Sequence, residues 1–425
     1  MSGNKFNPSF FRQPRYYNDF QCIGGSCPVS CCVMWDVDWT EPEIEKLKNA
    51  ECSEQLRNLA DNSFRPIEDK PGIFRVIMDS KKRCTFLTND NFCLIQRELG
   101  EEYLSNACMI YPRNSFLSEN TVANYCYLSC YKILDTLCND KDCMILENYN
   151  HVSKKTEKVS FDSKADILIR PELKYRNQLL EFFYEIISDE SRSLETSVTL
   201  GAVAAQDLAK SVSSGGADLI PERIAFLKKM LKDPKQTEKL ENLKPNYAVK
   251  LGFVKKLDDI VLKTNMIKLI SENGALIAEK YDEGMRKFNA AFAERPFALR
   301  NIALNLLLEL NMPFRSRDYS IFENYCYYAA AIAAVKLTAA AIFIKNKDSQ
   351  AAVTPVVTGS GKVAEAVRDI KISFKVATDS EHKFKTSLAC VDCLFAHNND
   401  NVQTIIDMYN ELNCMSPAYI ALILK

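Results

Sequence analysis

The sequence predicts a mainly α protein in which a small cysteine-rich module with few short strands is followed by a multi-helix body. Three observations support this fold class. Twelve of the sixteen cysteines lie between Cys22 and Cys143. Beyond about residue 171, apolar residues recur at the i, i+3, i+4 spacing of amphipathic helices. The 425-residue chain is 47% hydrophobic and 26% charged, which is typical of globular proteins long enough for a large core or two domains.

The elements expected in the first 150 residues are short. Thr40, followed by Pro42 and Glu43, has the pattern of a capped helix start, and this helix is expected to run to about Ala60. The other expected elements are a strand over residues 73–78, a helix from Phe92 to Gly100, and a short helix at Tyr103 and Leu104 leading to Cys108.

The rest of the chain is expected to be helical. A polar, lysine-bearing connector over residues 151–171 separates a module of residues 1–150 from a helical body of residues 151–425. Residues 211–246 are a candidate division within that body. Helices are predicted over residues 172–187, 221–231, 278–293, 297–310, 325–344 and 402–412, and loops at 213–216, 233–234 and 346–361.

Charge and targeting signals restrict the partners and the compartment. Lys+Arg 54 against Asp+Glu 55 leaves a net charge of -1, so we expect no nucleic-acid and no membrane partner held by bulk charge. The first 17 residues lack the apolar core of a secretory signal. The most apolar stretch, residues 325–344, is alanine-rich and contains Lys336, which predicts a buried packing helix. We therefore expect a cytoplasmic protein whose clustered cysteines are ligands rather than disulfides.

The cysteine spacing predicts a metal-cluster module. Cys22-x4-Cys27-x3-Cys31-Cys32 brings several thiols onto one glycine-containing loop, and Gly24 and Gly25 let the backbone turn tightly there. The three histidines lie outside this stretch, so the site must be sulfur-dominated, which excludes a histidine-rich zinc hydrolase. The spacing lacks the paired CxxC knuckles of a zinc ribbon, so an iron–sulfur cluster is favoured over zinc, and buried free cysteines remain the third alternative. Cys52 (mid-helix), Cys138, Cys143 and the Cys390-x2-Cys393 pair are interpreted as structural.

These residues resemble the flagellin lysine-N-methylases, a family whose N-terminal part is related to zinc- or iron-chelating cysteine modules. The matching motifs are Phe20-x-Cys22-x-Gly24-x-x-Cys27-x-x-x-Cys31-Cys32-x-x-Trp35, Cys84-Thr85-Phe86-Leu87, Cys93-Leu94-Ile95-Gln96, Cys108 before Tyr111-Pro112-Arg113, and Leu128-Ser129-Cys130. Weaker similarity continues at residues 301–314, at 372–374 and at Glu381-His382.

The resemblance implies transfer of a methyl group from S-adenosylmethionine to lysine ε-amines of bacterial flagellin. It also implies a [4Fe–4S] cluster in the cysteine module, with zinc as the alternative metal. The cysteines that match the motif, about four of which can ligate one cluster directly, are Cys22, Cys27, Cys31, Cys32, Cys84, Cys93, Cys108 and Cys130.

The sequence assigns no catalytic residue and no residue that binds the methyl donor. No GxGxxG follows a predicted strand, so the donor site is expected to be built from helices and the cysteine module. Asp36, Asp38, Tyr111 and Arg113 lie beside the cysteines and are weak candidates for orienting substrate; the alternative is that they only stabilise loops. Trp35 and Trp39 are expected to pack under the module, and His382 to be a hydrogen-bonded helix-end histidine. A non-catalytic iron- or zinc-binding protein and a redox sensor remain alternative functions.

Overall fold

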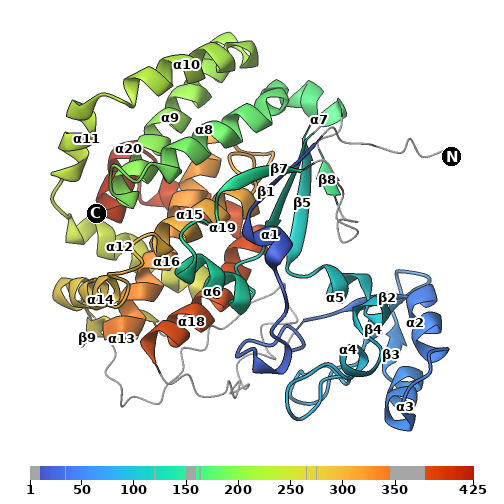
Figure 1. Cartoon of the computed structure of the whole chain (residues 1–425). Coiled ribbons are helices and arrows are strands. Elements are labelled where there is room, and N and C mark those ends of the chain that lie inside the picture. The colour runs from blue at the N-terminus through green and yellow to red at the C-terminus, as the bar shows by residue number, and fades with distance from the viewer. Residues whose placement is uncertain are drawn as a thin grey trace.

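A long buried helix, α16 (Ile321–Ile344), lies at the centre of the structure, with the other helices of the C-terminal half around it (Figure 1). The structure is a computed structural model that describes residues 10–33, 35–118, 121–149, 159–161, 164–264, 266–273, 275–344 and 379–425. It confirms the mainly α fold class. The predicted loop at 346–361, the similarity at 372–374, and residues 151–158 and 162–163 of the predicted connector lie outside the described residues. The described part of the connector contains a short strand (Val159–Phe161) and a short helix (Lys164–Ile169).

Helix α16 is accompanied in the described part of this half by shorter helices, only some of which the sequence predicted. They are α7 (Lys164–Ile169), α8 (Arg176–Ser188), α9 (Leu194–Gly215), α10 (Ile220–Met230), α11 (Pro234–Glu241), α12 (Tyr247–Leu257), α13 (Met266–Leu269), α14 (Ala278–Ala291), α15 (Ala298–Glu309), α18 (Ser380–Ala396), α19 (Asp400–Glu411) and α20 (Pro417–Leu424). All six predicted helices are confirmed within a few residues. The loop predicted at 213–216 is wrong: α9 continues to Gly215, and Gly216, with φ 92°, ends it.

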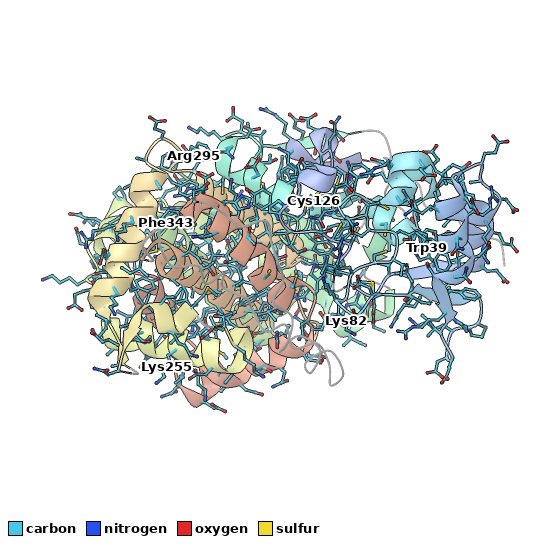
Figure 2. All side chains as sticks on the ribbon, turned by 90° about the horizontal axis from the view of Figure 1, so that it is seen from below. Trp39, Lys82, Cys126, Lys255, Arg295 and Phe343 are labelled. Atoms are coloured by element: carbon cyan, nitrogen blue, oxygen red, sulfur yellow. The ribbon has the colours of Figure 1, made fainter. Side chains whose placement is uncertain are left out.

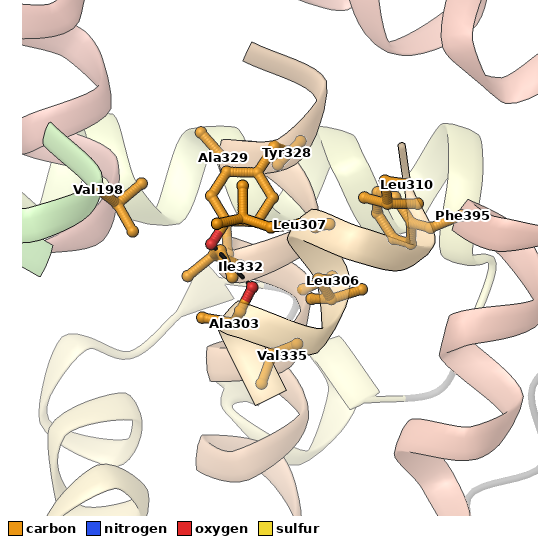
Figure 3. Close-up of a cluster of buried hydrophobic side chains, with 14 of the residues drawn as sticks. Val198, Ala303, Leu306, Leu307, Leu310, Tyr328, Ala329, Ile332, Val335 and Phe395 are labelled. Atoms are coloured by element: carbon orange, nitrogen blue, oxygen red, sulfur yellow. Dashed lines mark hydrogen bonds between the residues drawn. The ribbon is translucent and has the colours of Figure 1, made fainter. Parts of the chain in front are cut away.

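These helices form the large lobe of the protein. Its core is aliphatic and aromatic, and the side chains in it have almost no surface accessible to solvent. Figure 3 shows leucines of α15 packed against Tyr328, Ala329 and Ile332 of α16. The Tyr328 hydroxyl, buried in this cluster, donates to the carbonyl oxygen of Ala303 at 3.0 Å. The buried hydroxyl is therefore satisfied by the backbone of the helix it packs against.

The N-terminal half contains two sheets. A five-stranded mixed sheet has the order β7-β1-β6-β5-β8, formed by β1 (Phe10–Pro14), β5 (Arg113–Ser118), β6 (Thr121–Cys126), β7 (Leu146–Tyr149) and β8 (Val159–Phe161). A three-stranded sheet has the order β2-β4-β3, formed by β2 (Asp38–Thr40), β4 (Ile73–Val76) and β3 (Phe64–Pro66). A two-stranded ribbon, β9 (Ser271–Glu272) and β10 (Ala275–Leu276), lies in the large lobe.

The first 150 residues contribute to two separate cores. Residues 35–110, here called the small lobe, form a compact core under Trp39 with the β2-β4-β3 sheet, α2 (Glu41–Lys48), α3 (Glu54–Asn62), α4 (Leu94–Glu98) and α5 (Asn106–Ile110). The five-stranded sheet, α1 (Tyr16–Asp19) and α6 (Tyr131–Asn139) instead pack on the large lobe. Figure 2 shows Trp39 at one end of the molecule and Phe343 toward the other, with Cys126 between them.

Two predicted details of the small lobe need correction. The helix expected from Thr40 to Ala60 is broken into α2 and α3, because Ser53 caps a second helix by accepting a hydrogen bond from the Leu56 amide. Cys52 therefore lies between the helices rather than within one. The strand predicted at 73–78 and the helix ending at Gly100, where φ is 89°, are confirmed.

Helix α16 is long and apolar enough to cross a membrane, but 94% of its most apolar window is buried within the protein among the described residues. The prediction of a buried packing helix is confirmed. Its lysine, Lys336, is 5% exposed and donates from Nζ to Glu195 Oε1 of α9 and to the carbonyl oxygen of Leu424. Burial opposes ionisation of Glu195, but the Lys336 charge outweighs it and lowers the pKa of Glu195 to about 2.

Replacing Glu195 by glutamine should destabilise the fold by roughly 3–5 kcal/mol, because Lys336 would remain buried without a countercharge. The pKa of Glu195 is lower in the folded chain than its ordinary 4.5. Its stabilisation is therefore present above pH 4.5 and is lost as the pH falls towards 2. Denaturant midpoints measured across this pH window should fall in the wild type and change less in E195Q. The double variant E195Q/K336M should recover most of the loss; equal instability of both variants would contradict the ion-pair assignment.

Candidate metal centre

The first cysteine segment is a loop held against the rest of the small lobe. Gly24 and Gly25 lie in a 3₁₀ turn, and the Gly24 amide donates to Cys22 Sγ at 3.4 Å. Gly24 has φ 53°, and a Cβ built on it would lie 2.4 Å from the Phe92 ring. Glycine is therefore required both by the turn and by the close approach of the segment that carries Cys93.

The other cysteines are positioned by a backbone hydrogen bond between two cysteine segments and by the N-terminal ends of helices. The Cys84 amide donates to the Cys32 carbonyl oxygen at 2.8 Å, which ties the second segment to the first. Cys93 is the N-cap residue of α4, and Cys130 is the N-cap residue of α6. Cys108 lies in the first turn of α5, where its amide donates to Ser105 Oγ at 3.2 Å. Exposed helical N–H groups and the positive end of the helix dipole favour a thiolate or a cluster at such positions.

These segments enclose one large cavity between the two lobes, with a volume of about 960 Å³. The cysteines that line it are all eight of the motif: Cys22, Cys27, Cys31, Cys32, Cys84, Cys93, Cys108 and Cys130. The other lining residues include the aromatic rings of Trp35, Tyr111 and Tyr127 together with His397. The five segments that carry the cysteines are thus brought together over a sequence span of more than a hundred residues.

Burial controls the acidity of these thiols. It raises the pKa of Cys93 to about 11 against the opposing amides of Gln96 and Ile95. It likewise raises the pKa of Cys130 to about 12. A hydrogen bond from Cys31 lowers the pKa of Cys32, and the same contact raises that of Cys31. Most of these thiols are therefore neutral at pH 7 unless a cation stabilises the thiolates, which is the condition that a metal meets.

Interactions between the thiolate charges define two overlapping sets of cysteines. Cys84 interacts with Cys32, Cys93 and Cys108, and each of these three interacts with the other two. Cys22, Cys27 and Cys130 interact with one another in the same way. The first set is here called the quartet and the second the trio. Cys31 interacts with members of both, and the interactions of Cys27 with Cys32 and of Cys93 with Cys22 also link the two sets. The quartet thus contains four cavity-lining cysteines whose thiolate charges all interact with one another.

The four weak candidates for orienting substrate differ in their position. Asp36 and Asp38 both pair with Arg75 at 2.8 Å, and only Asp36 of these two lines the cavity. Tyr111 lines the cavity, and its hydroxyl donates to Ser129 Oγ at 3.2 Å. Arg113 also lines the cavity and donates to the Phe20 carbonyl oxygen at 2.9 Å, next to the loop that carries Cys22. Their roles in substrate binding stay predictions.

Several residues of the site were not predicted from the sequence. Trp35 was expected only to pack, but its ring lies edge-on to His397, with the centroids 5.0 Å apart, at the cavity wall. His397 follows the last residue of α18, and its Nε2 lies 3.1 Å from Ser129 Oγ. Trp39 is buried under the small lobe as expected, although it also borders the cavity, and His382 is hydrogen-bonded through Nδ1 to the Tyr131 hydroxyl at 2.8 Å. The only feature of the sequence that could have drawn attention to His397 is that the chain contains just three histidines.

Comparison with known proteins gives matches over most of the chain. Residues 180–358 match the family model of the FliB lysine N-methylase C-terminal domain. The lysine-N-methylase of Salmonella typhimurium is 22% identical over 371 residues, which are 81% of this chain and 89% of that protein. The lysine-N-methylase of Salmonella choleraesuis is 22% identical over 361 residues, which are 79% of this chain and 86% of that protein. The flagellar biosynthetic protein FliU of Salmonella muenchen is 26% identical over 136 residues, 32% of this chain and 80% of that protein.

No solved structure matches the chain. The family resemblance expected from the cysteine motifs is confirmed.

In the reduced, metal-free protein, Cys32 should be alkylated well before Cys84 near neutral pH. The contact with Cys31 lowers the pKa of Cys32, whereas burial raises that of Cys84 far above its ordinary range, and the thiolate is the reacting form. A time course with iodoacetamide, followed by mass spectrometry of the peptides, measures the order. Cys138, fully buried in α6, should react only after unfolding and serves as the internal control. Equal rates at Cys32 and Cys84 would contradict the geometry described above.

Proposed function

We propose that this chain, a member of the flagellin lysine-N-methylase family, transfers methyl groups from S-adenosylmethionine to lysine ε-amines of bacterial flagellin, with a [4Fe–4S] cluster bound by the cysteine module. The observation that carries the proposal is the cavity itself. It collects every cysteine of the family motif beside aromatic rings that include Trp35, Tyr111 and Tyr127, in a chain similar along most of its length to proteins named lysine-N-methylases.

The donor set fits an iron–sulfur cluster. Four thiolates on one zinc ion, with Zn–S distances of about 2.3 Å, would lie about 3.8 Å apart. Among the described residues, no three cysteine sulfurs approach within 4.8 Å of one another. Wider spacing suits a cluster, because iron and sulfide ions lie between the ligating sulfurs. We assign the quartet, Cys32, Cys84, Cys93 and Cys108, as the residues that hold it.

The remaining walls fit the other requirements of methyl transfer. The methyl donor is a sulfonium cation and the incoming lysine is an ammonium cation before it loses its proton, and both bind favourably to aromatic faces. Trp35, Tyr111 and Tyr127 supply such faces in the cavity. The lysine must be neutral to act as a nucleophile, so a partly enclosed, apolar wall that disfavours the charged amine assists the reaction. The residues of this cavity would therefore exclude water and align the methyl group of the donor with the lysine amine.

The cluster would supply one electrophilic or redox-active centre beside the bound donor. The chain's own residues hold it and set its surroundings. Backbone N–H groups at the start of α4 face Cys93 and oppose the rise of its pKa, which favours thiolate ligation there. The Arg113 contact with the Phe20 carbonyl fixes the loop that closes the cavity near Cys22.

The proposal is tested by methylation of flagellin by the iron-loaded protein. Intact-mass spectra should show additions of single methyl groups only when S-adenosylmethionine is present, and peptide spectra should place them on lysines. Cys84→Ala should lose both iron and methylation, because it removes a member of the quartet. A loaded wild-type protein that leaves flagellin unmodified would contradict the proposal and favour the non-catalytic metal-binding alternative.

Cys52→Ala is the matched control for Cys84→Ala. Cys52 lies in the same lobe, packs at the edge of the same core and does not line the cavity. This variant should keep the iron and acid-labile sulfide content of the wild type together with its methylation. Loss of iron in both variants would show that the small lobe is merely intolerant of substitution.

A further inference from the structure

Behind the aromatic wall of the cavity, three further groups converge. Glu309 ends α15, Asp392 lies in α18, and His397 follows the end of α18. One ligand atom of each residue lies within 4.8 Å of those of the other two. None of the three belongs to the cysteine motif, and His397 alone lines the cavity.

The carboxylates of Glu309 and Asp392 are buried next to each other, and hydrogen bonds replace only part of the hydration that they lose on burial. Asp392 is 3% exposed, and neither of its side-chain oxygens makes a hydrogen bond of ordinary geometry among the described residues, although the Ser129 amide and Glu309 lie close enough to oppose the rise in its pKa that burial causes. Glu309 is 2% exposed and accepts hydrogen bonds from the Leu128 amide and from Asn305 Nδ2. A buried, unpartnered carboxylate beside a second carboxylate requires a bound cation or a shared proton.

Arg315 is a positive charge that acts on both carboxylates, but its Nη2 group is hydrogen-bonded elsewhere. Arg315 donates from Nη2 to the carbonyl oxygens of Phe395 and Ala396, both at 2.9 Å. It therefore caps the end of α18, and its charge influences the carboxylates without an ion pair to either of them among the described residues. The C-terminal ends of α15 and α18 both meet here, and the negative ends of two helix dipoles favour a cation.

The imidazole ring of His397 is in the neutral form that binds metal ions, and a hydrogen bond orients it. Burial and the nearby Arg315 lower the pKa of His397 to about 4, so the ring is neutral at pH 7. Ser129 Oγ lies 3.1 Å from Nε2 and also accepts from the Tyr111 hydroxyl. A hydrogen bond from one ring nitrogen to an outer partner is the usual way in which a ligating histidine is oriented, and it leaves the other nitrogen for a metal.

We propose that Glu309, Asp392 and His397 bind a divalent first-row transition cation in the wall of the cavity, separate from the cysteine-bound metal. Two carboxylates and one imidazole suit Mn²⁺, Fe²⁺ or Zn²⁺, whereas the thiols across the cavity prefer softer ions and clusters. Of the three ligands, His397 alone reaches the cavity, and the two carboxylates lie buried behind it. The site does not depend on the proposed methylation.

A shared proton is the competing occupant, and the two differ in their pH dependence. Burial raises the pKa of Asp392 to about 7, although its contact with Glu309 opposes this rise. Burial together with the Asp392 charge raises the pKa of Glu309 well above its ordinary value, so the metal-free pair holds a proton at neutral pH. A cation must displace that proton. Its affinity should therefore fall as the pH is lowered through 7.

Mn²⁺ is the probe that separates this site from the cysteines, because it prefers oxygen and nitrogen ligands over thiols. Loss of the free-Mn²⁺ electron paramagnetic resonance signal on titration into the full-length, cysteine-reduced protein should report a single saturable site. Asp392→Asn, which keeps the side-chain volume, should weaken Mn²⁺ binding by about tenfold or more. His397→Gln should have a similar effect, which provides a second variant if Asp392→Asn is unstable.

Two control variants should bind Mn²⁺ as the wild type does. Cys84→Ala removes a cysteine-site ligand, and Asp407→Asn makes the same substitution at an exposed position of α19. Absence of Mn²⁺ binding by the wild type at pH 8 would overturn the proposal and leave the shared proton as the occupant. So would equal binding by the wild type, Asp392→Asn and His397→Gln, or loss of the site in Cys84→Ala.

Discussion

A row of polar side chains on one face of α15 holds the two halves of this protein together. Asn301, Asn305 and Glu309 follow one another at intervals of four residues, and each is buried. Asn301 donates to the carbonyl oxygens of Leu137 and Asp140, and Asn305 donates to that of Cys126. Glu309 accepts from the amide of Leu128. Residues 126–140 are therefore fixed to the helical core by hydrogen bonds rather than by apolar packing alone.

These hydrogen bonds must all form together, because a buried polar group without a hydrogen-bond partner lowers the stability of the fold. The same row also receives a contact from the N-terminus, since the Tyr16 hydroxyl donates to Asn305 Oδ1 and accepts from the Cys126 amide. Three segments distant in sequence thus share one hydrogen-bond network. The network determines where β6 ends and α6 begins, and through them where Cys130 enters the cavity.

The fold was predictable where burial follows a simple period. The helices α10, α14, α15 and α19 each present an apolar face, and their bounds agree with the sequence within a few residues. The five-stranded sheet was missed because its interior positions are polar. Ser115 donates to Asn124, Asn124 donates to Gln13, and all three are buried, so the alternation of apolar and polar residues that marks a strand is absent. Helix α9 was also missed, because it is buried on most sides and rich in small residues, which leaves little amphipathic contrast.

The cysteine half of the site could be foreseen, and the other half could not. Short spacings and two glycines identified the loop from Cys22 to Cys32, and the cavity does collect the eight motif cysteines. Asp392 and His397, in contrast, lie more than 250 residues further along the chain in an otherwise ordinary helix, and no local pattern distinguishes them. Only Asn301, Asn305 and Glu309 form a pattern that is visible in the sequence, because they place polar residues every four positions in an otherwise apolar helical segment.

Residues 128–130 connect these two halves physically. The Leu128 amide donates to Glu309, Ser129 Oγ meets both Tyr111 and His397, and the Cys130 thiol lines the cavity. Any movement of α15 relative to α18 would therefore shift a thiol on one side of the wall and the oxygen and nitrogen ligands on the other. Because soft sulfur and harder oxygen and nitrogen donors prefer different ions, one short turn can serve both without their competing for the same metal.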